Sequence, residues 1–140
     1  MVIKQLSVFL ENKPGYLLCA ADSLAKNGVN IRALSLADTA EFGILRLIAD
    51  RPEEGRRVLS DLGLVVRLTD VLAVSMDDTP GGMLTVLSCL GEAGINVEYM
   101  YASSGSGRRA VMILQTSDTA RADAILREHG MAEPSPEDLA

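Results

Sequence analysis

The sequence repeats itself at a constant offset of 66 residues. At this offset, and without any gap, eight positions of the first half carry the same residue as their counterparts in the second half. A fixed internal period of this length is typical of a duplicated supersecondary unit, so the chain is a tandem repeat. The identical pairs are Leu6/Leu72, Val8/Val74, Pro14/Pro80, Gly15/Gly81, Leu18/Leu84, Leu24/Leu90, Gly28/Gly94 and Asn30/Asn96.

Each repeat alternates strand and helix signals in the same order. Short apolar runs predict strands, and leucines and alanines at helical spacing predict helices. Pro14 suits a first helical position, and Asp50 can cap the second helix. The expected elements of the first repeat are strands at 3–10, 30–38 and 42–49, helices at 15–27 and from Pro52 to Gly63, and a last strand from Leu64. That strand runs without a linker into the second repeat, whose further elements are helices at 81–92 and 118–128 and strands at 96–103 and 108–116.

The order strand–helix–strand–strand–helix–strand defines the fold class as α+β. Such a unit forms a four-stranded antiparallel sheet with both helices on one face, so we predict two tandem ferredoxin-like βαββαβ repeats. We expect residues 1–69 to form the first domain, residues 70–132 the second, and the acidic residues 133–140 a frayed tail. The face of such a sheet that no helix covers is too apolar to remain exposed to solvent. We therefore expect sheet packing, sheet extension or dimerisation.

Charge and cysteine content exclude several classes of protein. The net charge is −6, and residues 70–140 hold four basic residues against eleven acidic ones, so no basic face exists for a nucleic acid. No apolar run approaches the length of a membrane span, and the N-terminus lacks the layout of a signal peptide. Cys19 and Cys89 have neither metal-type nor disulfide-type spacing. They fit small buried residues of a cytoplasmic protein.

The turns before the first helices carry a resemblance to a known family. In the first repeat, residues 12–15 are Asn-Lys-Pro-Gly, and the helix that follows ends at Gly28, which precedes Val-Asn-Ile. In the second repeat, residues 78–81 are Asp-Thr-Pro-Gly and residues 94–97 are Gly-Ile-Asn-Val. The pattern resembles that of the ACT domain family, and above all its small stand-alone tandem proteins, from residue 3 to about residue 131. The resemblance implies a regulatory module that binds an amino acid or a similar small ligand, often at an interface between domains.

The resemblance also implies where the ligand binds, because family contacts come from the turn before the first helix and from the start of the second strand. Asp78 replaces the asparagine of the motif, and its charge disfavours a carboxylate, so it either accepts an ammonium group or leaves that site empty. In the first repeat the implied positions are Asn12, Lys13, Pro14, Gly15, Tyr16, Asn30 and Ile31. In the second repeat they are Asp78, Gly81, Gly82, Asn96 and Val97.

Elementary chemistry supports the first of these sites independently. Free N–H groups at a helix start favour an anion, so an α-carboxylate fits against Gly15 and Tyr16. Asparagine offers a donor and an acceptor, so we hypothesise that Asn12 and Asn30 meet at one end of the first helix and hold both charged groups of a zwitterion. The alternative is that Pro14-Gly15 is only a strand-to-helix turn and that Asn30 is only a β-turn residue or a helix-terminus contact.

Three other features are weaker candidates. The stretch 103–109 lacks the lysine and the following helix of a phosphate-binding loop, so we expect a flexible hairpin loop whose arginines could contact an anion or a partner. Tyr99 and Tyr101 share one strand face and fit either interface packing or a ligand wall. His129 is the single histidine and sits near a helix end, so no catalytic triad or histidine metal site is supported.

The combined expectation is a non-catalytic regulatory protein that binds a free amino acid and forms a homodimer in the cytoplasm. Its signal would pass to an unidentified enzyme or regulator, and no cofactor or metal is expected. One alternative is a ligand-free structural module that dimerises through its sheets and modulates a partner enzyme. Another is a small enzyme on the ferredoxin-like fold, although no nucleophile or acid–base pair stands out.

Overall fold

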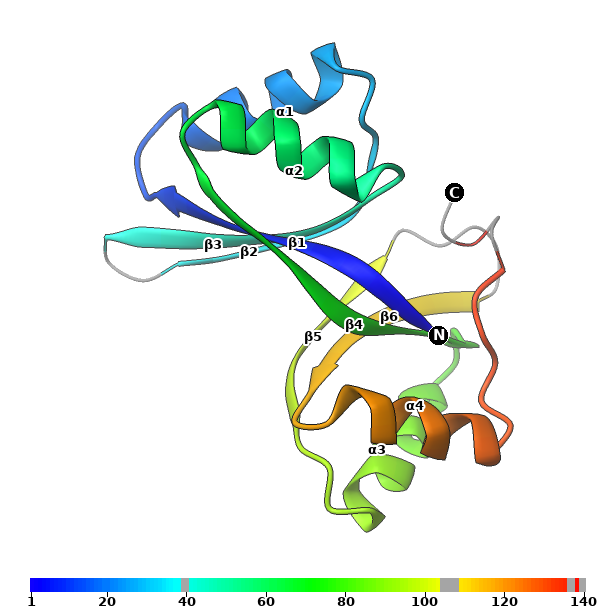
Figure 1. Ribbon diagram of the computed structural model, residues 1–140. Helices are drawn as coiled ribbons and strands as arrows, with labels where there is room; N and C mark the ends of the chain where they lie inside the picture. Colours follow the sequence, from blue (N-terminus) through cyan, green and yellow to red (C-terminus); the bar gives the residue numbers. More distant parts are fainter. Residues whose placement is uncertain (39–40, 104–108, 136–137, 139–140) are drawn as a thin grey trace. The chain divides into compact units, whose positions relative to one another are not determined.

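The computed structural model describes residues 1–38, 41–103, 109–135 and 138. Its elements confirm the two tandem ferredoxin-like repeats (Figure 1). The expected loop at 104–107 and part of the expected turn at 39–41 lie outside the described residues. The first repeat contains β1 (Val2–Glu11), α1 (Tyr16–Lys26), β2 (Ile31–Asp38), β3 (Phe42–Ala49), α2 (Pro52–Asp61) and β4 (Val65–Asp77). The second repeat continues from β4 into α3 (Gly82–Glu92), β5 (Val97–Ser103), β6 (Arg109–Thr116) and α4 (Thr119–Glu128).

The strand β4 belongs to both repeats. It runs without a break through the point where one repeat passes into the next, as the absence of a linker predicted. The chain divides into two compact units, one of residues Lys4–Thr69 and one of Met1–Ile3 with Asp70–Ala140.

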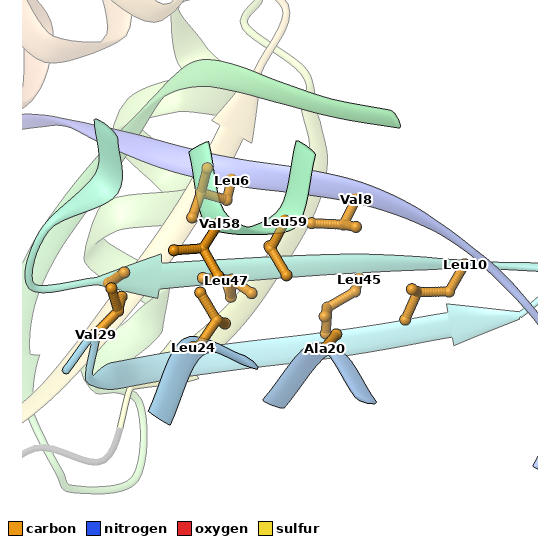
Figure 2. Close-up of a cluster of buried hydrophobic side chains, with 11 residues drawn as sticks. Leu6, Val8, Leu10, Ala20, Leu24, Val29, Leu45, Leu47, Val58 and Leu59 are labelled. Carbon is orange, nitrogen blue, oxygen red and sulfur yellow. The ribbon is translucent and has the colours of Figure 1, made fainter. Parts of the chain in front are cut away.

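In the first unit the strands are hydrogen-bonded in the order β2-β3-β1-β4, and α1 and α2 cover one face of the sheet (Figure 1). The antiparallel register of β1 and β3 places Leu6 opposite Leu47 and Val8 opposite Leu45, so these side chains share that face. Figure 2 shows them packed against residues of both helices. Full burial of such a leucine or valine stabilises the fold by about 1.5–3 kcal/mol. The helix residues of this core are Ala20, Leu24, Val58 and Leu59.

In the second unit β6 pairs with both β4 and β5, and α3 and α4 cover one face of the sheet (Figure 1). Along the other edge of β4, Met1 and Ala73 exchange both backbone hydrogen bonds, at 2.9 and 3.3 Å. The Ser75 N–H donates to Ala132 O at 3.1 Å. The place of a fourth strand is therefore taken by the start of the chain and by a short segment at Ala132. Pro134 limits that segment because proline cannot donate to a ladder.

Two predicted helix starts are wrong. The helix α1 begins at Tyr16 because Gly15 adopts a left-handed conformation, with φ 88°, that cannot continue a helix. Pro14 therefore lies in the preceding turn and not at the first helical position. Asp50 does not cap α2, because its carboxylate accepts the Asn30 N–H at 2.9 Å instead. The N-cap of α2 is Arg51, with no side-chain cap among the described residues.

Candidate ligand-binding turns

The turn before α1 is held by backbone hydrogen bonds. The Asn12 N–H donates to Glu41 O at 3.1 Å, and the Lys13 N–H donates to Glu11 O at 2.9 Å. Gly15 is the N-cap of α1. A Cβ on Gly15 would meet no atom within 4 Å, so the positive φ, and not a lack of space, requires glycine there. The turn thereby fixes the direction in which the first N–H groups of α1 point.

The start of α1 is uncapped. The first N–H groups of a helix have no partner within the helix, and no side chain of the described residues caps them here. The first turn of α1 also holds no acidic residue that would balance the positive end of the helix dipole. The Tyr16 N–H donates to Lys13 O at 3.4 Å, so the N–H groups of Leu17 and Leu18 are the ones available to an anion.

A small hollow of about 70 Å³, the β2-side hollow, lies beside this turn. Its walls bring together groups of both charges. Lys13 Nζ and Glu11 Oε2 form an ion pair at 3.1 Å, and the hydrogen bond to Glu11 raises the pKa of Lys13. Asp38 and Leu36 of β2 complete the site and were not predicted, because only the strand register brings them beside the turn. The lining residues are Leu10, Glu11, Asn12, Lys13, Leu17, Leu36, Asp38 and Gly43.

A second hollow, of about 360 Å³, adjoins the start of α1 and is lined by Pro14, Gly15, Tyr16 and Cys19. None of these lining residues is charged. The interpretation of Cys19 as a buried residue is wrong, because its side chain is exposed, whereas Cys89 is buried as expected. The core side of α1 is formed by Ala20 and Leu24, and Cys19 lies away from it.

The turn before α3 repeats this backbone geometry. Gly81 is the N-cap of α3 and has φ 83°. A Cβ on Gly82 would collide with the backbone carbonyl of Asp77, so position 82 requires glycine. Gly82 corresponds to Tyr16 at the repeat offset, so the first repeat has an aromatic ring at this position and the second repeat has no side chain there. A hollow of about 350 Å³ adjoins Gly82 and is lined also by Ser75, Met76, Asp77, Thr85, Val86, Arg109, Gly130, Met131 and Ala132.

Arg109 lines this hollow, although the sequence placed it only at the edge of a loop. It lies directly opposite Asp77 in the register of β4 and β6. Its guanidinium donates to Ser75 Oγ at 2.7 Å, to Asp77 Oδ1 at 2.9 Å and to Ser75 O at 3.1 Å. Antiparallel pairing of oppositely charged residues is the signal that could have identified it. Asp78 is exposed and does not line this hollow.

The predicted meeting of Asn12 and Asn30 is wrong within one repeat. Asn12 precedes α1 and Asn30 follows it, and the eleven residues of α1 span about 16 Å. Asn12 lies beside Glu41, before β3, whereas Asn30 lies beside Asp50, after β3. The two asparagines therefore cannot hold one amino acid within a single repeat.

The start of each second strand has a structural role in its own repeat. The Asn96 N–H donates to Ser117 Oγ at 3.1 Å, and the Ser117 N–H donates to Asn96 O at 2.9 Å. Asn30 makes the corresponding pair with Asp50. The next residues, Ile31 and Val97, are partly buried and pack against the two helix-side cores.

The remaining candidates lie on β5 and at the end of α4. Tyr101 is buried and Tyr99 half-buried on β5. His129 is the C-cap of α4, and its Nδ1 lies 2.8 Å from Ile125 O. Within the described ranges, no group of His, Cys, Asp or Glu side chains could hold a metal ion. None of the described helices is long and apolar enough to cross a membrane.

Two ferredoxin-like repeats, each with a left-handed glycine before a helix that no side chain caps in the described residues, define a class of tandem α+β modules. Comparison with protein families then gives the particular family. The chain belongs to the ACT domain family, because the family model described as an ACT domain pair matches residues 1–139. The resemblance drawn from the turns is thereby confirmed.

Solved structures share this fold. Protein BT0572 from Bacteroides thetaiotaomicron is 37% identical, with a TM-score of 0.92 over 99% of this chain and 96% of that chain. The ligand-free regulatory subunit of aspartate kinase from Thermus thermophilus is 17% identical, with a TM-score of 0.68 over 93% of this chain and 95% of that chain. The regulatory subunit from Thermus flavus is 19% identical, with a TM-score of 0.64 over 91% and 92%. No curated protein matches the sequence. The family supports a regulatory, ligand-binding role.

Proposed function

We propose that the protein is a non-catalytic regulatory protein that binds a free amino acid at the turn before α1. The observation that carries this proposal is the β2-side hollow, where an uncapped helix start adjoins Asn12, Lys13 and Asp38. The first N–H groups of α1 and the Lys13 ammonium suit an α-carboxylate. The Asn12 side-chain oxygen and the Asp38 carboxylate suit an α-ammonium. Both ends of a zwitterion thus find partners of the right charge.

The size of the β2-side hollow supports binding by a homodimer. Its volume of about 70 Å³ fits the charged end of an amino acid, whereas small-molecule pockets usually enclose roughly 300 Å³ or more. A second wall is therefore needed around the ligand's side chain. We propose that another copy of the chain supplies this wall and contributes its own Asn30, because Asn30 of the same repeat lies at the far end of α1.

The second repeat offers a different and weaker site. Asp78 places a carboxylate where the first repeat has Asn12, and Arg109 is already bound to Asp77 and Ser75. We propose that this turn either accepts an ammonium group through Asp78 or stays empty. The first turn is therefore the main ligand site.

Regulation follows if the ligand favours one arrangement of the subunits over another, because a ligand shifts an equilibrium by its difference in affinity. Two solved structures with this fold are regulatory subunits of aspartate kinase. We propose that this chain likewise acts on a partner enzyme or regulator, which the sequence does not identify. The free cysteines Cys19 and Cys89 are consistent with a cytoplasmic location.

The second candidate function is a ligand-free dimerisation module that modulates a partner enzyme. Exposed leucines on α1 and β2 favour it, since contiguous apolar surface marks an interaction site. The two candidates differ in one measurable property, which is the binding of a small molecule.

A thermal-shift screen against the twenty amino acids tests the proposal. A ligand bound only by the folded state stabilises it by about 2.7 kcal/mol at a hundredfold excess over Kd. We expect a shift with one amino acid or a chemically related group. Asn12→Ala should abolish this shift, and Asn27→Ala, the same change at the other end of α1, should retain it. A shift that persists in Asn12→Ala contradicts the proposed site, and no shift at millimolar ligand favours the ligand-free module.

A further inference from the structure

The hollow of about 350 Å³ beside α3 lies entirely within the second unit. Its lining residues come from the end of β4, the first turns of α3, the start of β6 and the segment after α4. Small-molecule pockets usually enclose roughly 300–1,000 Å³, so its volume suits a small ligand. Asp78 does not line it, so it is separate from the amino-acid position that the family pattern implies in this repeat. This cavity is called the β4-edge hollow.

The polar groups of the β4-edge hollow are specific to the second repeat. At the repeat offset, four lining positions carry two aromatic rings, a cysteine and a glycine in the first repeat. In the second repeat they carry two hydroxyl groups, a guanidinium and a glycine. The corresponding pairs are Phe9/Ser75, Tyr16/Gly82, Cys19/Thr85 and Gly43/Arg109. The second repeat therefore has open space and hydrogen-bonding groups where the first repeat has rings.

The guanidinium of Arg109 is held at the edge of β4 that borders the hollow. The Ser75 N–H donates to Ala132 O at 3.1 Å, so the N–H and C=O of Ser75 point to the edge of β4 away from β6. Arg109 Nη2 donates to this Ser75 O at 3.1 Å, and its Nε donates to Ser75 Oγ at 2.7 Å. Nη1 donates to Asp77 Oδ1 at 2.9 Å. A guanidinium has five N–H groups, so one on each terminal nitrogen remains for a ligand.

Two hydroxyl groups add to these donors. Ser75 is 4% exposed, and its Oγ accepts from Arg109, while no acceptor in the described part of the chain receives its hydrogen. Thr85 is exposed on α3 and lines the same hollow. The apolar part of the wall is formed by Met76, Val86 and Met131. The β4-edge hollow thus combines several hydrogen-bond donors with an apolar wall.

We propose that the β4-edge hollow binds a small aliphatic 2-oxo acid. The remaining N–H groups of Arg109 suit the carboxylate, because charge-assisted hydrogen bonds to a guanidinium are strong. The oxo oxygen is an acceptor and suits the Ser75 and Thr85 hydroxyl groups. The aliphatic chain suits the apolar wall, where it is removed from water.

Charge disfavours two other classes of ligand. Among the described lining residues the one carboxylate is that of Asp77, and Arg109 already binds its Oδ1. The ammonium group of an amino acid would therefore meet a neutralised carboxylate beside a guanidinium. The second charge of a phosphate would face the same carboxylate in a chain of net charge −6. A monoanion without a cationic group fits the hollow best.

This inference goes beyond the proposed function and does not rest on it. The β2-side hollow and the β4-edge hollow share no lining residue and lie in different units. A chain with both sites would bind an amino acid at α1 and a nitrogen-free carbon skeleton at α3. Its regulatory output would then depend on the relative amounts of the two ligands.

A ¹H–¹⁵N NMR titration with three probes of one carbon skeleton tests the ligand class. The probes are 2-oxoisocaproate, isocaproate and leucine, which differ at the second carbon. We expect 2-oxoisocaproate to shift the amides of Gly82, Thr85 and Met131 in a saturable way. Isocaproate should bind there about five to ten times more weakly, because it lacks one acceptor. Leucine should leave these three amides in place. No shift with millimolar 2-oxoisocaproate, or equally tight binding of either other probe, overturns the proposal.

Variants of two lining residues test the assigned contacts. Arg109→Gln should weaken binding of 2-oxoisocaproate at least about tenfold, since a charged donor is lost. Arg127→Gln is the matched control, because Arg127 pairs with Asp123 and Glu133 and does not line the hollow. Equal affinity of these two variants overturns the proposal.

Thr85→Val keeps the shape of an exposed side chain and removes its hydroxyl group. It should lower the affinity for 2-oxoisocaproate toward that for isocaproate and leave isocaproate binding unchanged. An equal effect on both probes contradicts the hydroxyl contact. Asn12→Ala should leave 2-oxoisocaproate binding unchanged, so failure of this site is distinguishable from failure of the amino-acid site.

Discussion

The backbone N–H of Asn30 donates to Asp50 Oδ1 at 2.9 Å, and the N–H of Asp50 donates back to Asn30 O at 3.1 Å. In the second repeat Asn96 and Ser117 form the same reciprocal pair, with a hydroxyl in place of the carboxylate. Each pair ties the start of one strand to the end of its neighbour. The asparagines of the family pattern thus act structurally through their backbone, which leaves the Asn30 and Asn96 side chains outside these bonds.

Asp50→Ala should lower the free energy of unfolding by about 1–2 kcal/mol, because the Asn30 N–H loses its acceptor. Asn30→Ala should change it by less than about 0.5 kcal/mol, since the bond uses the backbone. Urea unfolding measures both values, and Asp50→Asn is the control that keeps an oxygen acceptor. Equal stability of Asp50→Ala and the wild type would show that the pair does not contribute.

Two glycine-to-alanine changes should have effects of opposite sign. Gly15→Ala places a Cβ in a left-handed conformation and should cost about 1–2 kcal/mol. Gly91 lies inside α3, and a Cβ there would meet nothing within 4 Å, so Gly91→Ala should stabilise by about 0.5–1 kcal/mol. Thermal unfolding of the two variants checks this. A stabilising Gly15→Ala would argue against the left-handed turn.

Acid should weaken one ion pair on α2. Arg57 Nε donates to Glu54 Oε2 at 3.1 Å, and this hydrogen bond lowers the pKa of Glu54 from its ordinary 4.5. The pKa of Glu54 is therefore lower in the folded protein than in the unfolded chain. The ion pair stabilises the folded state fully at pH values above the unfolded pKa, and this stabilisation is lost as the pH falls through the folded pKa. The effect should be small, because Arg57 is exposed to solvent and Glu54 is partly exposed.

An NMR titration of the Glu54 carboxyl measures this directly. We expect its pKa to be low in the wild type and to rise toward the ordinary value in Arg57→Gln. Arg56→Gln, which removes the neighbouring pair with Glu53, should leave it unchanged. A Glu54 pKa that does not respond to Arg57→Gln would refute the assigned cause.

The fold could be predicted because independent signals agreed. Leu6 and Val8 recur at strand spacing and Leu24 at helical spacing, and all three lie in one core. The predicted helix starts were wrong where two local structural preferences competed. Pro14 favours a helix start, but the left-handed Gly15 follows it and delays α1. Asp50 favours a cap, but the Asn30 N–H takes its carboxylate.

The candidate site could be predicted only where it is local in sequence. Asn12 and Gly15 belong to one turn, so a short motif identifies them. Asp38 reaches the β2-side hollow, and Arg109 reaches Asp77, through strand pairing that no local motif reveals. The misplacement of Asn30 was avoidable, because the predicted helix at 15–27 already separates Asn12 from Asn30 along its whole length.

Binding of an amino acid at the start of α1 is tested most directly by a ¹H–¹⁵N NMR titration with the amino acid that gives the largest thermal shift. The carboxylate should accept hydrogen bonds from the available N–H groups at the start of α1, so the amide signals of Leu17 and Leu18 should move most, while those of α4 stay in place. A bound amino acid that leaves these two amides unmoved and shifts only signals elsewhere would contradict the proposed site.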